Sequence, residues 1–307
     1  MTEPAARALA HVRALGAAGD LPLPDARITV NFHPDRLLAD GRTVAEHLVT
    51  GGAYRSQFES GISNGGLTAY PGGDRERWEW RMFGGAYPAE LTVGRPVYGG
   101  LNLAGHVDGA SPRFGSCHLV LRAGATRRAT FSHGDSVTEP AVVGTADTFG
   151  GIWAALLEQV ARTGTALGLA ADSPEAWVDL LARPRPAAGR AMDDYVEAQL
   201  HGGLDLAADV EVVVADPSFA GTPTAAHLAA VAPLRYHPGF ELEATAFPAD
   251  LRGPEAAALA RTLGPGLIDA AVIGRAARTV TDAGTRQLLK YLWHILVLRG
   301  RPRGSRG

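Results

Sequence analysis

The stretch YVEAQLH (residues 195–201) alternates polar and apolar side chains. A β-strand repeats every two residues, so one face of this segment is apolar and the other carries four polar groups. Those polar residues are Tyr195, Glu197, Gln199 and His201. A carboxylate in such a row can accept hydrogen bonds from sugar hydroxyls and offset positive charge at an anomeric carbon. The alternative interpretation is an ordinary strand with one face in solvent.

Residues 28–33 (ITVNFH) alternate in the same way and predict a half-buried strand that Pro34 ends at His33. Periodicity and turn residues predict the other elements. Strands are expected at 98–103, 114–121, 127–132 and 209–215. Helices are expected at 5–17, 43–50, 149–162, 175–183, 222–231, 254–263 and 281–299, and a further helix is expected to begin at a cap formed by Asp74. A glycine-rich loop is expected at 51–73. This order indicates an α+β fold.

The same pattern predicts the domain organisation. An N-terminal helix (1–25) precedes a main domain (26–245) that contains a helical insertion at about 149–190, of which 182–191 is a proline- and arginine-rich linker. A C-terminal helical segment (246–299) and a basic tail (300–307), expected to be disordered, complete the chain.

Composition narrows the class of protein. The 307 residues include 29 basic and 32 acidic side chains, a formal net charge of −3, and 46% hydrophobic residues. Such a chain can bury a core, and its charge disfavours binding of nucleic acid by bulk attraction. The single cysteine, Cys117, and the scattered histidines lack the spacing of a metal site, so no metal is expected. The first residues do not resemble a signal peptide, and no apolar run is long enough to span a membrane, so we expect a soluble, cytoplasmic protein.

A second polar segment, YRSQFESGISNGG (54–66), combines hydrogen-bonding side chains with glycines that let backbone N–H groups approach an anion. Its candidate ligand-binding residues are Arg55, Ser56, Gln57, Ser63 and Asn64. The segment is neither a Walker loop nor a G-x-G-x-x-G motif. A surface turn is the alternative interpretation.

Three shorter segments place candidate residues at strand ends. His33 and Arg36 lie where the first strand stops, and Arg36 could bind a pyrophosphate. Tyr98 opens one strand, and Ser116 lies on the face that also carries His118 in the next. Cys117 is expected to be a small buried thiol.

Taken together and in order, seven segments resemble a little-characterised bacterial family catalogued as a domain of unknown function. They are FHPDR (32–36), YRSQFESGISNGG (54–66), GGDRERWEW (72–80), RPVYGGLNL (95–103), SPRFGSCHLVL (111–121), DYVEAQLHG (194–202) and DVEVVVADPSF (209–219). That family is distantly similar to the ADP-ribosyltransferases, which transfer ADP-ribose from NAD and release nicotinamide. The resemblance implies a split, NAD-binding pair of β-sheets, here with helical additions.

The resemblance also implies residue roles. His33 would match a first-strand residue that holds a ribose or the nicotinamide amide, and Tyr98 the aromatic residue that stacks on nicotinamide, with Ser116 as the competing candidate. Glu197 would match the catalytic glutamate. Arginine-directed transferases carry Glu or Gln where this chain has Tyr195, and Gln199 could instead occupy the catalytic position, as in an inactive member.

The expected activity is therefore transfer of ADP-ribose from NAD, used as substrate, to a protein or small-molecule acceptor. Arg36 and Arg55 would hold the diphosphate, and the 54–66 loop would cover the nicotinamide. Glu59, Tyr195 and Gln199 would lie toward the acceptor. Three alternatives remain open: an NAD glycohydrolase, a glycoside hydrolase that pairs Glu59 with Glu197, and a non-catalytic nucleotide-binding module.

Overall fold

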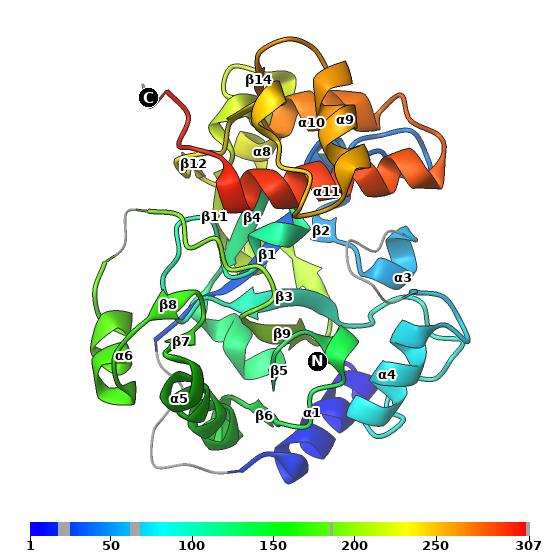
Figure 1. Cartoon of the computed structure of the whole chain (residues 1–307). Helices are drawn as coiled ribbons and strands as arrows, with labels where there is room; N and C mark the ends of the chain where they lie inside the picture. Colours follow the sequence, from blue (N-terminus) through cyan, green and yellow to red (C-terminus); the bar gives the residue numbers. More distant parts are fainter. Residues whose placement is uncertain (18–24, 62–67, 185–186, 305–307) are drawn as a thin grey trace.

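A computed structural model describes residues 1–17, 25–61, 68–184 and 187–304 (Figure 1). Helices and strands alternate around a mixed sheet of eight strands in the order β12-β11-β4-β1-β3-β9-β5-β6. In chain order these strands are β1 (Ile28–Phe32), β3 (Val97–Leu101), β4 (Cys117–Leu121), β5 (Ala129–His133), β6 (Val143–Thr145), β9 (Val196–Leu200), β11 (Val210–Ala215) and β12 (Leu234–Tyr236). The α+β class expected from the sequence is confirmed.

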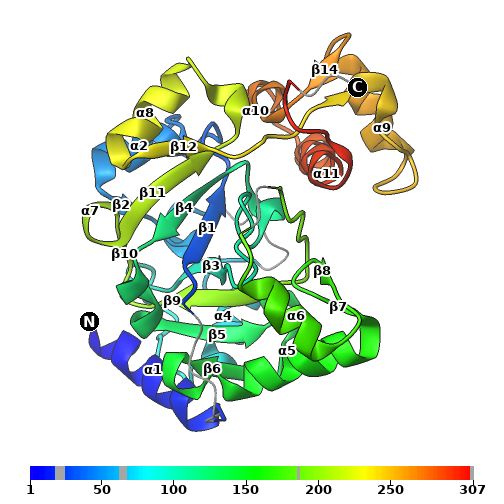
Figure 2. The same ribbon diagram turned by 90° about the vertical axis from the view of Figure 1, so that its left-hand side faces the viewer.

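The large sheet is nearly divided where β1 meets β3. The two strands are in register only at Ile28 opposite Leu101 and at Thr29 opposite Gly100. Farther along, β1 pairs with β4 through Phe32, and β3 pairs with β9 along its whole length. Figure 2 shows β11, β4 and β1 running in a different direction from β3, β9 and β5. The two halves of the sheet therefore diverge from the β1–β3 contact.

Helices cover both halves of the sheet, and the pairs α2 with α8 and α9 with α11 pack together (Figures 1 and 2). The helices are α1 (Glu3–Leu15), α2 (Val44–Gly51), α3 (Gln57–Ser60), α4 (Asp74–Met82), α5 (Gly150–Thr163), α6 (Pro174–Leu181), α7 (Leu206–Asp209), α8 (Pro223–Val231), α9 (Pro254–Thr262), α10 (Ala270–Ala277) and α11 (Ala283–Arg299). Three two-stranded sheets complete the fold: β2 (Ala53–Tyr54) with β10 (Leu204–Asp205), β7 (Thr165–Ala166) with β8 (Leu169–Ala170), and β13 (Leu242–Glu243) with β14 (Leu267–Ile268).

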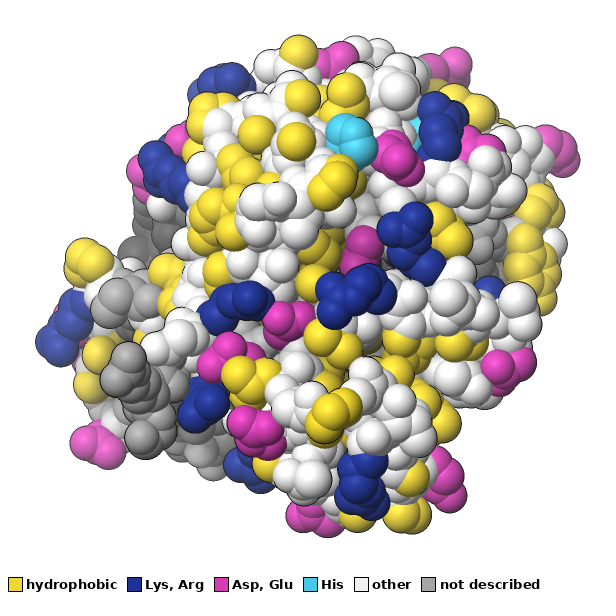
Figure 3. Space-filling model, turned by 90° about the horizontal axis from the view of Figure 1, so that it is seen from above, with side chains coloured by type: hydrophobic (Ala, Val, Ile, Leu, Met, Phe, Trp, Pro, Cys, Tyr) yellow, Lys and Arg dark blue, Asp and Glu magenta, His cyan; other side chains and the backbone are white. Residues whose placement is uncertain are grey.

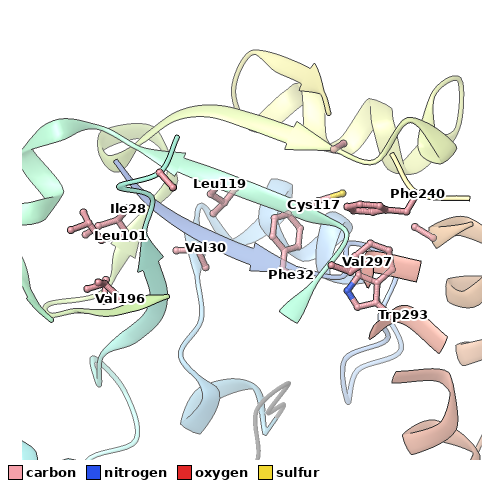
Figure 4. Packing of buried hydrophobic residues seen from close by; sticks show 14 of the residues in the cluster. Ile28, Val30, Phe32, Leu101, Cys117, Leu119, Val196, Phe240, Trp293 and Val297 are labelled. Atoms are coloured by element: carbon pink, nitrogen blue, oxygen red, sulfur yellow. The ribbon is translucent and has the colours of Figure 1, made fainter. Parts of the chain in front are cut away.

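The core continues from the sheet to the C-terminal helix (Figure 4). Phe32 at the end of β1 and Cys117 at the start of β4 are paired neighbours, and both are fully buried. Trp293 and Val297 of α11 belong to the same apolar cluster. The Trp293 indole donates a hydrogen bond of 2.8 Å to the carbonyl of Pro112, which ties α11 to the loop before β4. Burial of this apolar surface fixes α11 beside the end of β1.

Several expectations from sequence are wrong in detail. Both faces of β1 and β9 are buried, so β1 is not a half-buried strand and 195–201 is not a solvent-facing one. Gly73, not Asp74, is the N-cap of α4. The loop expected at 51–73 contains β2 and α3, and α10 was not expected at all.

Two residues, Arg301 in the described part of the C-terminal tail and Arg190 in the described part of the 182–191 segment, are tied to the rest of the fold. Arg301 pairs with Glu241 through two backbone hydrogen bonds of 2.9 Å, so the described part of the tail is ordered. Arg190 donates side-chain hydrogen bonds to the carbonyls of Val297 and Gly300, which anchors the end of the linker on α11.

The surface above α9, α10 and α11 carries basic and acidic side chains interspersed, with scattered apolar groups (Figure 3). Among the helices of the described residues, none has both the length and the apolar character needed to cross a membrane.

Candidate active site

A cavity opens where β1 and β3 diverge. Its walls come from the end of β1, the segment from α2 to α3, the start of α4, the start of β3 and the start of β9. Its polar and aromatic lining residues are Asn31, His33, Arg36, His47, Tyr54, Arg55, Ser56, Gln57, Ser60, Arg75, Tyr98, Ser111, Phe114, Asp135, Tyr195 and Glu197. Its volume is about 100 Å³, comparable with the ~150 Å³ cavity that accommodates benzene in another protein.

Glu197 is the most buried carboxylate of this lining, with 3% of its surface exposed. Its Oε1 atom accepts a hydrogen bond of 3.0 Å from the Gln199 amide. Its Oε2 atom accepts from the Ser136 hydroxyl (3.2 Å) and more distantly from the Ser136 backbone N–H (3.4 Å). Burial raises the pKa of Glu197, while the positive charge of Arg75 lowers it. Its donors therefore fix the position of this carboxylate in the cavity wall.

Tyr195 joins Glu197 to a second carboxylate. The Tyr195 hydroxyl lies 3.1 Å from Oε2 of Glu197 and 3.2 Å from Oδ2 of Asp135. Burial, and then the charge of Glu197, raises the pKa of Tyr195 well above its usual value, so the phenol stays protonated and donates. Asp135 in turn lies 3.6 Å from the guanidinium of Arg113. Hydrogen bonds thus connect the side chains of Glu197, Tyr195 and Asp135 into one group.

Arg75 and Tyr98 form the opposite part of the wall. The guanidinium carbon of Arg75 lies 4.1 Å from the centre of the Tyr98 ring, and its Nη1 donates to Ser136 Oγ at 2.5 Å. The Tyr98 hydroxyl donates to Oε1 of Glu79 at 2.8 Å, and the other oxygen of Glu79 accepts from Arg95 at 2.6 Å in a fully buried ion pair. Arg75 covers one face of the Tyr98 ring, Trp78 lies 6.0 Å from it, and Tyr98 also lines the cavity.

The cavity lining includes His33 beside the two arginines Arg36 and Arg55. Burial, together with Arg36 and Lys290, lowers the pKa of His33 to about 3, so its imidazole is neutral at physiological pH. Burial also lowers the pKa of Arg36. Arg55 is exposed, and both arginines line the cavity.

The cavity thus brings together many of the residues expected from sequence. They are His33, Arg36, Arg55, Ser56, Gln57, Tyr98, Tyr195 and Glu197. Ser63 and Asn64 lie outside the described residues. For Gln199, Ser116 and Glu59, the structure corrects the expectation.

Gln199 is fully buried and is not part of the cavity lining. It supports Glu197 and does not replace it. Ser116 is buried too, its backbone carbonyl accepts from His237, and it does not line the cavity. The Glu59 carboxylate accepts the backbone N–H of Ser56 in a capping box at the start of α3. Because Glu59 does not line the cavity, the geometry lends no support to a glycoside hydrolase pair with Glu197.

Several lining residues were not identified as site candidates from sequence, among them Asn31, Ser111, Arg75 and Asp135. Asn31 shares the polar face of β1 with His33, so strict alternation could have indicated it. Arg75 and Asp135 reach the cavity from a helix and a loop, and no sequence pattern placed them there.

No group of three or more histidine, cysteine, aspartate or glutamate side chains suited to a metal occurs within residues 1–17, 25–61, 68–184 and 187–304. Cys117 is a buried free thiol, and burial raises its pKa well above the usual value. It is therefore an inert core side chain.

Comparison with known proteins places the chain in a family. No curated protein matches it significantly. The family model described as "Protein of unknown function (DUF3626)" matches residues 27–299, which include every described element from β1 to α11. The protein is therefore a member of the DUF3626 family.

Proposed function

We propose that this protein is an ADP-ribosyltransferase, which cleaves the nicotinamide–ribose bond of NAD and transfers ADP-ribose to a protein or small-molecule acceptor. One observation carries the proposal: His33 directly after β1, Tyr98 on β3 and Glu197 on β9, distant in sequence, line a single cavity. The divergence of β1 from β3 at this cavity agrees with the split sheet that the resemblance implies.

The chemistry assigns Glu197 its role. The C1′–N bond breaks, nicotinamide leaves with the bonding electrons, and the ribose becomes a cation of oxocarbenium character. An acceptor then bonds to C1′ and loses its proton. The Glu197 carboxylate accepts a ribose hydroxyl proton in a hydrogen bond and offsets the growing positive charge, because its donors already hold it in place. The positive nicotinamide ring of NAD also favours the ionised form of Glu197.

The dimensions of the cavity support this arrangement. A volume of about 100 Å³ is suited to one ring, so only the nicotinamide end of the dinucleotide would lie inside. The nicotinamide would pack beside the Tyr98 ring, which lines the cavity. Arg36 and Arg55, which also line it, would hold the diphosphate, because guanidinium groups bind phosphate in a bidentate manner.

The test is release of nicotinamide from NAD by the purified chain, together with transfer of label from NAD to protein in a lysate. We expect Glu197→Gln to lower the rate of release roughly 10²–10³-fold. Glu59→Gln is the matched control, since Glu59 lies outside the cavity lining. Equal rates for Glu197→Gln and the wild type would refute the proposal. Release of nicotinamide without labelled protein would instead identify an NAD glycohydrolase.

A further inference from the structure

A set of basic side chains surrounds Lys290 and His294 on helix α11. We call it the α11 basic cluster and define it as Arg36, Arg113, Arg252, Lys290 and His294. Lys290 and His294 are four residues apart on α11 and so share one face of that helix. The charges of Arg252, Arg113 and Lys290 act on His294 together.

His294 is the buried member of the cluster, with 5% of its surface exposed. Within the described part of the chain, neither of its ring nitrogens has a hydrogen-bond partner. Its ring lies 6.3 Å from that of Tyr291, over which the Arg252 guanidinium sits at 5.6 Å. Burial and the surrounding cations lower the pKa of His294 to about 3, so the ring is neutral, with one donor and one acceptor nitrogen. Two unpaired buried nitrogens are rare unless a ligand or water satisfies them.

Lys290 is the only lysine of the chain. It is half-buried, and among the described residues no carboxylate lies within 4.0 Å of its ammonium group. Burial and the charges of Arg113 and Arg36 lower its pKa. Arg113 is compensated by Asp135 and Asp193, but no acidic side chain is ion-paired with Lys290 or Arg252 in the described ranges. The like charges around Lys290 repel its ammonium group, and a bound anion would offset that repulsion.

The cluster shares one residue, Arg36, with the cavity lining. The His33 ring lies edge-on to Trp293 at 5.4 Å, and Trp293 directly precedes His294 on α11. His33 and Arg36 line the cavity. His33 therefore lies between the cavity and helix α11.

We propose that the α11 basic cluster binds a phosphate or diphosphate group of a ligand that also enters the cavity, with Lys290 as the main cation and His294 as a neutral hydrogen-bond donor. Phosphate oxygens match both, since the ammonium offers three donors and the imidazole one. The identity of the ligand as NAD or an acceptor rests on the proposed function, whereas phosphate binding by the cluster does not. The phosphate could belong to NAD itself or to a phosphorylated acceptor.

The test is calorimetric titration of the full chain with inorganic pyrophosphate. We expect Lys290→Met to weaken pyrophosphate binding at least tenfold. Arg299→Met is the matched control: it removes one positive charge from the exposed end of the same helix and should bind as the wild type does. Absence of binding to the wild type, or equal affinity for both variants, would overturn the proposal.

His294→Phe gives a second test, because it keeps a flat ring of similar size while removing both nitrogens. We expect it to weaken pyrophosphate binding severalfold with an unchanged melting temperature, and unaltered affinity would remove His294 from the site. Titration with ADP-ribose then separates the sources. If pyrophosphate competes with ADP-ribose, the phosphate is that of the dinucleotide; if both bind together, it belongs to the acceptor.

Phosphate binding by the α11 basic cluster does not depend on transferase activity. A chain that releases no nicotinamide but binds pyrophosphate through Lys290 would contradict the transferase and support the phosphate site. Glu197→Gln should bind pyrophosphate as the wild type does, since Glu197 is not part of the cluster.

Discussion

On strand β9, the side-chain amide of Gln199 donates a hydrogen bond of 3.0 Å to Oε1 of Glu197, two residues earlier on the same face. Thr130 on the neighbouring strand donates to the amide oxygen of Gln199 at 2.7 Å, which fixes the orientation of the amide. Gln199 is therefore a positioning residue for the carboxylate, held in turn by β5.

Gln199→Met removes the hydrogen bond to Glu197 with little change in volume. Loss of one such bond corresponds to about 1.4 kcal/mol, so we expect kcat for nicotinamide release to fall roughly tenfold with KM for NAD unchanged. Gln199→Glu should lower kcat further. It should also move the acid limb of the pH dependence of kcat to higher pH, because a second carboxylate raises the pKa of Glu197. Profiles of both variants identical to the wild type would contradict this role.

Arg75→Met should change the pH dependence of the reaction. The carboxylate of Glu197 must be ionised, burial raises its pKa, and Arg75 is the main group that lowers it. The rate therefore falls as the pH drops through this pKa, and removal of Arg75 moves that fall to higher pH. Rates of nicotinamide release between pH 5 and 9 measure the shift. Arg77→Met, exposed on the same helix, should leave the profile in place, and a shift of equal size there would contradict the assignment to Arg75.

Asp35 makes the stability of the chain depend on pH. Burial raises its pKa from 3.8 to about 6, so the folded chain binds more protons than the unfolded chain between these values. The free energy of unfolding therefore decreases as the pH rises from about 4 to 6, and above pH 6 the stabilising contribution of protonated Asp35 is absent. Asp35→Asn should raise the free energy of unfolding by about 3 kcal/mol at pH 8 and by far less at pH 4. Urea unfolding at both pH values measures this, with the exposed Glu158→Gln as control.

Asp35 also leaves no space at Gly274 of α10. A Cβ atom added there would lie 1.3 Å from Oδ2 of Asp35. We expect Gly274→Ala to destabilise the chain by about 1–3 kcal/mol through overpacking. The loss should shrink when Asp35→Ala is also present, and strictly additive effects in thermal unfolding would show that another contact is responsible. Gly284→Ala, where the nearest atom would lie at an ordinary 3.4 Å, is the matched control.

Local patterns predicted much of the fold. Alternation located β1 and β9 within a residue or two at each end, because buried strands with one polar and one apolar face leave a clear period of two. The helix α10 was missed because its sequence AAVIGRAA is short and almost uniformly small or apolar, although Asp269 caps it and its buried residues Ala270, Ile273 and Gly274 follow helical spacing. Short strands such as β6 depend on a neighbouring strand and leave little local signal.

The candidate site was predictable where a strand carried it. Glu197 and Tyr98 follow from the two-residue repeat and the resemblance, whereas Arg75 comes from a helix that packs against Tyr98 only in the folded chain. Glu59 was misjudged although its local signal was present. Ser56 and Glu59 form an S-x-x-E pair at a helix start, which predicts that the carboxylate bonds to the backbone.

The short contact between β1 and β3 leaves space for the cavity but limits the stability of the sheet. Substitutions that drew the two strands together would lengthen the hydrogen-bond ladder and make the chain harder to unfold, but they would also fill the hollow beside Glu197. Variants selected for heat resistance alone should therefore tend to lose ligand binding. In this fold, we expect an open cavity to go together with a moderate melting temperature.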